Sequence, residues 1–117
     1  MVKNYRDLIV WQKSMDLVTK TYNLIKTLPK EELYALSSQM RRAAISIPSN
    51  IAEGYGRRST KEYINFLHIA RGSNAELQTQ LLICVNLGYL QEKDITTVFK
   101  LSEEVSKIIN TIISKIG

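Results

Sequence analysis

The chain has 117 residues, of which 44% are hydrophobic and 23% are charged, and this composition predicts one globular domain over residues 1–117. The 5 glycines and 2 prolines are too few for a collagen-like or linker sequence, and the single cysteine excludes an intrachain disulfide. A net charge of +5 favours anionic partners. We expect no targeting segment and no membrane partner, and therefore a cytoplasmic location, because no charge-free stretch reaches the roughly 20 residues of a membrane span.

The first predicted helix runs from about Asp7 to Thr27. It ends before Pro29, because the residue that precedes a proline is disfavoured in helical conformation. Steps of three and four residues separate its apolar side chains, which predicts that they form the core-facing stripe. This stripe consists of Leu8, Trp11, Met15, Val18, Tyr22 and Ile25.

The second predicted helix has Glu31 and Glu32 in its first turn, where the helix dipole favours carboxylates, and ends at Gly54 and Gly56. Its expected apolar stripe is Leu33, Leu36, Met40, Ala43, Ile47 and Ile51. Pro48 interrupts the backbone hydrogen bonding, so the helix either kinks there or a new helix begins with Pro48 in its first turn. The apolar phase continues across Pro48, which favours the kink.

The third predicted helix begins with a capping box from Ser59 to Glu62 and continues through Gly72, because both sides of Gly72 share one apolar phase. Gly88 is the expected residue just beyond its end. Its stripe is Tyr63, Phe66, Ala70, Leu77, Leu81 and Cys84. The last helix carries Ile95, Val98, Leu101, Val105, Ile108, Ile112 and Ile116.

Strand patterns are weak throughout the chain. Four amphipathic helices of about 21 to 29 residues with short connections predict an all-α fold, an antiparallel up-down-up-down four-helix bundle. The second helix is kinked at Pro48 in this prediction, and the body is roughly 30 to 40 Å long.

The residues that catalysis needs are scarce in this sequence. The single histidine, His68, and the single cysteine, Cys84, lie about 24 Å apart along one predicted helix, so they cannot form a pair within the chain. A di-iron site requires glutamate three residues before histidine, and Asn65 stands there. We therefore predict a protein that is not an enzyme and has no cofactor or metal.

Polar side chains on the second and third predicted helices are expected to meet when these helices pack antiparallel. The expected buried network comprises Asn50, Glu53, Arg71, Ser73 and Glu76, with Arg71 pairing Glu53 or Glu76 and fixing the register. A catalytic carboxylate site is the weaker alternative, because no second titratable group is evidently placed beside it.

Basic residues form two candidate nucleic-acid sites. Arg57, Arg58 and Lys61 stand at the start of the third predicted helix, where the dipole repels cations, so they indicate phosphate binding; salt bridges to Glu53 and Glu62 are the alternative. Heptad spacing produces two further basic stripes, Arg6, Lys13 and Lys20 on the first helix and Lys93, Lys100 and Lys107 on the last. If the two stripes lie side by side, they form a surface that can follow a phosphate backbone and that includes Lys13, Lys20, Lys100 and Lys107. A solvated helix face gives the same pattern.

Adjacent apolar residues widen the stripes of the last two helices beyond what one seam buries. The widened positions are Leu81-Leu82-Ile83, Ile108-Ile109 and Ile112-Ile113. This excess predicts self-association, and a charge placed at Ile109 or Ile113 should dissociate the assembly if those residues lie outside the bundle seam.

The chain resembles the bacterial four-helix bundle proteins encoded in 23S ribosomal RNA intervening sequences. Between Tyr5 and Leu90 the resemblance is carried by DLIVWQKSMDLV, LSSQMRRAAISIPSNIAEGYGRRSTKEYINFLHIARGSNAELQTQL and LGYL. It implies a four-helix bundle that forms ring-shaped homopentamers. The chain is also similar to the accessory protein of diversity-generating retroelements, which implies RNA or DNA, and a reverse transcriptase or other RNA-binding protein, as partners.

The residues and the resemblance together predict a non-enzymatic, oligomeric bundle that binds structured RNA or an RNA–protein complex. The alternative is a protein-interaction scaffold whose net charge only keeps it soluble.

Overall fold

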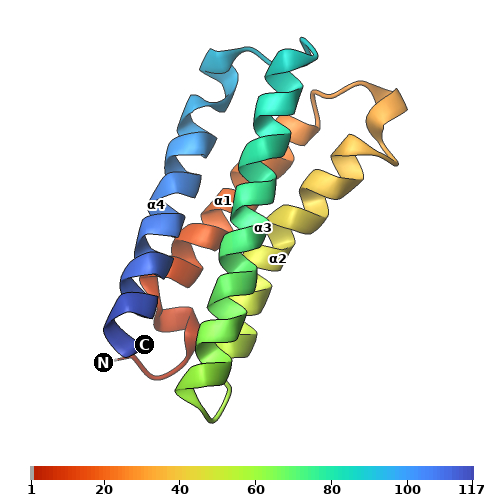
Figure 1. The fold of residues 1–117 in the computed structure, drawn as a ribbon. Helices are drawn as coiled ribbons and strands as arrows, with labels where there is room; N and C mark the ends of the chain where they lie inside the picture. Colours follow the sequence, from red (N-terminus) through yellow and green to blue (C-terminus); the bar gives the residue numbers. More distant parts are fainter. Residues whose placement is uncertain (1) are drawn as a thin grey trace.

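The structure is a computed structural model that describes residues 2–117 and consists of four long helices with no strand among those residues. The helices are α1 (Ile9–Ile25), α2 (Leu36–Tyr55), α3 (Thr60–Asn86) and α4 (Glu92–Ile116), and short 3-10 turns cover Tyr5–Asp7 and Lys30–Glu32. Successive helices run in opposite directions along a body of 43 × 25 × 20 Å, and both ends of the chain lie at the end that carries the α2–α3 turn (Figure 1). The all-α four-helix bundle is confirmed.

Local sequence signals set the ends of α3. The Ser59 hydroxyl accepts a hydrogen bond of 3.1 Å from the Glu62 amide, which satisfies one free N–H of the first turn. At the other end Gly88 adopts a φ of 77°, and the Tyr89 amide reaches back 2.9 Å to the Cys84 carbonyl. This left-handed cap ends the helix sharply, as expected for glycine just beyond a helix terminus.

The second helix begins later than predicted. Glu31 and Glu32 belong to the separate 3-10 turn, and α2 starts at Leu36. The Glu32 carboxylate accepts hydrogen bonds from the Leu36 amide at 3.3 Å and from the Tyr89 hydroxyl at 2.8 Å. Glu32 thereby connects the start of α2 to the α3–α4 turn.

Both helices that contain a breaker residue are continuous. The helix α2 extends through Pro48 to Tyr55, so a new helix does not begin at Pro48, and the kink itself stays a prediction. The helix α3 continues through Gly72, as predicted.

The core-facing side of α1 differs from the predicted stripe. Its buried residues are Val10, Ser14, Leu17, Thr21 and Ile25. The predicted core residue Met15 is 43% exposed. The Ser14 hydroxyl can occupy the core because it donates to the Trp11 carbonyl of its own helix at 2.8 Å. The apolar pattern therefore misplaced the core face by part of a turn.

The C-terminal half of α4 is more deeply packed than its sequence indicated. Ile109 is fully buried, and Ile108, Ile112 and Ile113 are partly buried against the core. Ile109 therefore does not lie outside the bundle seam, because α4 contacts both α1 and α3 and needs a wide apolar stripe to do so.

Candidate nucleic-acid interface

The α2–α3 turn holds its three predicted cations in different environments. The Arg57 guanidinium forms an ion pair of 2.8 Å with Glu53 and lies 4.9 Å from the centre of the Phe66 ring. Arg58 and Lys61 are exposed, and neither has an ion-pair partner among residues 2–117. The salt-bridge alternative therefore describes Arg57, while Arg58 and Lys61 remain available to an anion at the start of α3.

Other basic side chains lie at the same end of the bundle. The turn Tyr5–Asp7 contacts α2, and Gly117 packs near Ile64 in the first turns of α3. These contacts place both chain ends beside the α2–α3 turn (Figure 1). We call this surface the basic end; it comprises Lys3, Arg6, Arg57, Arg58, Lys61 and Lys115.

The basic end has three acidic residues, Asp7, Glu53 and Glu62, and each already has a hydrogen-bond or ion-pair partner. Glu53 pairs with Arg57, and the Asp7 carboxylate accepts the backbone N–H groups of Lys3 and Asn4 at 2.9 and 3.3 Å. The opposite end carries Lys26, Lys30 and Lys93 with Glu31, Glu32, Glu92 and Asp94. Positive charge is therefore concentrated at one end of the bundle.

The two basic stripes of α1 and α4 come together on one face. Lys13 of α1 forms an ion pair of 2.9 Å with Glu104 of α4. Because Lys100 and Lys107 stand about one turn before and after Glu104, all three lysines lie near this contact. Lys20, two turns further along α1, pairs with Asp16 at 2.8 Å. This α1–α4 face has weaker positive character than the basic end, since carboxylates offset two of its four lysines.

Polar side chains do bridge the helices, but in two groups rather than the predicted one. Between α2 and α3 the Ser46 and Ser73 hydroxyls share a hydrogen bond of 2.8 Å, and the Asn50 amide donates to Ser46. Between α3 and α4 the buried Asn74 amide donates to the Ser102 carbonyl and the Ser106 hydroxyl, each at 2.7 Å. The predicted network includes neither Asn74 nor its serine partners.

The predicted pairing of Arg71 with Glu53 or Glu76 is wrong. Arg71 donates to Asn110 of α4 at 2.8 Å and to the His68 ring at 2.7 Å. Glu53 pairs with Arg57, and Glu76 is exposed on the side of α3 that faces α2. The five predicted residues do not form one network, because Arg71 points towards the opposite neighbour of α3.

The two side chains most able to act as a nucleophile or a base, Cys84 and His68, lie in different environments. Cys84 is buried with its sulfur 3.7 Å from the Met40 sulfur, and burial raises the pKa of the thiol, which keeps it protonated and unreactive. His68 is exposed on the side of α3 that carries Arg71. Residues 2–117 contain no group of three His, Cys, Asp or Glu side chains placed to hold a metal ion, and no helix within them is long and apolar enough to cross a membrane.

Two shallow apolar grooves run between neighbouring helices. The α1–α2 groove contains no charged residue in its lining, which consists of Tyr5, Trp11, Met15, Val18, Ile45, Pro48, Ser49 and Ala52. The α3–α4 groove has carboxylates beside its apolar lining.

Comparisons with known proteins agree with this fold. Residues 6–111 match the family described as 23S rRNA-intervening sequence protein. A crystal structure of a protein with unknown function from the S23 ribosomal protein family of Bacteroides thetaiotaomicron superposes with a TM-score of 0.83 at 27% identity, covering 90% of this chain and 98% of that chain. Comparison with curated proteins gives no match.

Proposed function

Since the chain belongs to the 23S rRNA-intervening sequence protein family, we propose that it is a non-enzymatic, oligomeric bundle that binds structured RNA or an RNA–protein complex. The observation that carries this proposal is the basic end, where Arg58 and Lys61 are exposed at the start of a 27-residue helix and have no ion-pair partner within the described residues 2–117. Phosphate groups fit this surface, because guanidinium and ammonium groups donate to phosphate oxygens and the helix dipole adds to their charge. The α1–α4 face is the secondary contact, where Lys100 and Lys107 have no ion-pair partner among the residues that the structure describes.

Binding through phosphates is tested by a salt titration on an RNA hairpin. The Arg58→Ala/Lys61→Ala variant is compared with Lys26→Ala/Lys30→Ala, which removes the same charge from the opposite end. Each lost phosphate contact flattens the slope of log K against log salt by up to about one unit, so the first variant should lose up to about two units. The control should keep the parental slope. Arg57→Ala alone should have a smaller effect on the slope, because Arg57 is already paired with Glu53.

Two results would count against this proposal. If the two double variants bind the hairpin equally well, net charge rather than the basic end determines binding. If the parent protein does not bind RNA even at low salt, the scaffold function takes its place. The uncharged α1–α2 groove favours that alternative, since exposed apolar surface commonly marks a protein interface.

Self-association is the second part of the proposal, and the resemblance makes a homopentamer the expected form. Apolar side chains at the α1–α2 groove support it, because Met15 and Ile45 are 43% and 44% exposed in the single chain. Light scattering at micromolar concentration should give a mass several times 13.4 kDa, and Ile45→Glu should lower it. A parental mass of one chain would refute self-association.

A further inference from the structure

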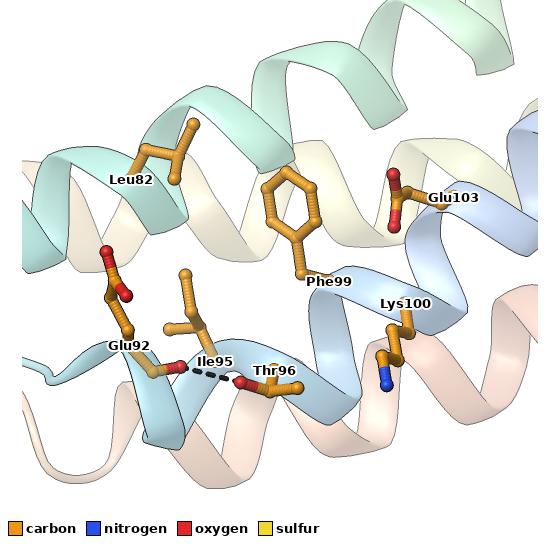
Figure 2. Close-up of a pocket in the computed structure, with 7 residues that line it drawn as sticks. All are labelled: Leu82, Glu92, Ile95, Thr96, Phe99, Lys100 and Glu103. Atoms are coloured by element: carbon orange, nitrogen blue, oxygen red, sulfur yellow. Dashed lines mark hydrogen bonds between the residues drawn. The ribbon is translucent and has the colours of Figure 1, made fainter.

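The α3–α4 groove combines an apolar floor with acidic ends. Leu82 of α3 and Ile95 and Phe99 of α4 line a hollow of about 280 Å³, and Leu82 is 49% exposed. Glu92 and Glu103 stand at its two ends, with Leu82 and Phe99 between them (Figure 2). Neither carboxylate has an ion-pair partner among residues 2–117.

The charge of this groove is opposite to that of the whole chain. Lys100 also lines the groove, but its ammonium group points away from Leu82 and Phe99 (Figure 2). The residue that α3 contributes to the lining, Leu82, is uncharged. The groove therefore presents two carboxylates without ion-pair partners in the described part of the chain, on a protein of net charge +5, and phosphates are unsuitable occupants.

We propose that the α3–α4 groove docks a basic amphipathic helix of a partner protein. Glu92 and Glu103 are eleven residues apart on α4, which corresponds to about 16 Å or three turns. A helix lying along the groove meets both carboxylates if it carries two apolar residues, with a lysine or arginine one turn before the first and another one turn after the second. The apolar residues, themselves one turn apart, then contact Leu82 and Phe99.

The occupant is a partner rather than a second copy. Lys30 and Arg41 are the only two basic residues of this chain that stand eleven positions apart. Of the two positions between them that would face Leu82 and Phe99, positions 34 and 37, the second is the polar Ser37. This chain therefore lacks the complementary helix that the groove fits. The surface is separate from the basic end, so the proposal is tested in the absence of RNA.

The probe is a synthetic, fluorescently labelled helical peptide of about 16 residues, mostly alanine and glutamine, with two leucines one turn apart, a lysine one turn before the first leucine and a lysine one turn after the second. Its binding is measured by fluorescence anisotropy at low salt. Glu92→Gln/Glu103→Gln should weaken binding about 3- to 10-fold, as expected for two exposed charge pairs. Leu82→Ala should weaken it as well, by removing apolar contact. Glu31→Gln/Glu76→Gln is the matched control, since it neutralises two exposed carboxylates elsewhere and should bind as the parent does.

Each other outcome overturns the proposal. The first is that the peptide does not bind the parent protein, or that a peptide with its lysines moved to the face opposite the leucines binds equally well. The second is that the control variant weakens binding as much as Glu92→Gln/Glu103→Gln. The third is that Glu92→Gln/Glu103→Gln lowers the mass in light scattering without peptide, which shows that a second copy covers the groove. Circular dichroism of each variant confirms that these exposed substitutions leave the fold intact.

Discussion

Replacing Gly54 with alanine tests how closely α2 and α3 approach each other. A Cβ atom at Gly54 would lie 2.5 Å from the Phe66 Cβ and 3.2 Å from the Tyr63 ring. Ordinary carbon–carbon contacts are about 3.5 to 4.0 Å, so the helices must separate by about 1 Å. The Phe66 Cβ is attached directly to the backbone and cannot rotate away. Overpacking of this kind costs up to about 3 kcal/mol, and alanine recovers about 1 kcal/mol of helix propensity, so the net loss is about 2 kcal/mol.

The same substitution at Gly72 is the matched control. A Cβ there meets nothing within 4 Å, so Gly72→Ala should stabilise α3 by about 1 kcal/mol. Urea denaturation followed by circular dichroism measures both variants, at several protein concentrations because self-association adds to apparent stability. The two variants should differ by about 3 kcal/mol with opposite signs relative to the parent. Equal stabilisation of both would refute the close α2–α3 contact at Gly54.

Three further predictions concern stability. In the same denaturation assay Leu17→Ala should lower the free energy of unfolding by about 2 to 5 kcal/mol, and Met15→Ala by less than about 1 kcal/mol. A larger loss for Met15→Ala than for Leu17→Ala would support the core stripe predicted from the sequence. Asn74→Ala should cost about 2 to 4 kcal/mol, because it removes buried hydrogen bonds and leaves a cavity; a loss below about 0.5 would show that the α3–α4 polar group contributes little. The hydrogen bond to Glu32 raises the pKa of Tyr89. This hydrogen bond therefore stabilises the fold fully at neutral pH, and its contribution is lost as the pH rises past about 10 and the Tyr89 hydroxyl loses its proton. Tyr89→Phe should therefore weaken the pH dependence of stability above pH 10, and an unchanged alkaline profile would contradict the link.

The fold was predictable because helical periodicity, caps and breakers act locally. Ser59 and Gly88 marked the ends of α3 correctly, since each satisfies backbone groups within a few residues of itself. The core face of α1 was not predictable in the same way. Buried Ser14 and Thr21 look polar in the sequence, while half-exposed Met15 looks apolar, and only the packing of α1 against both α2 and α4 distinguishes them.

The candidate site was predictable only in part, because some of its cations pair with carboxylates on another helix. The spacing of Arg57 and Glu53 by four residues already allowed their ion pair. The ion pair between Lys13 and Glu104 joins residues far apart in the chain, so no local pattern indicates it. The basic end was missed for the same reason, since Lys3 and Lys115 come from opposite ends of the sequence.

RNA binding and self-association form one hypothesis, because the α2–α3 turn of a single chain offers only two cations, Arg58 and Lys61, without an ion-pair partner among residues 2–117. In this hypothesis Arg58 and Lys61 supply about two phosphate contacts per subunit, and each contact contributes weakly at physiological salt. In the proposed ring these contacts would be repeated on one particle, so that after the first contact the others would bind at a high effective concentration. Ile45→Glu should therefore abolish tight RNA binding together with the assembly, although it leaves every cation of the basic end in place. An Ile45→Glu monomer that retained parental affinity would separate the two properties and would restrict RNA recognition to the surface of one subunit.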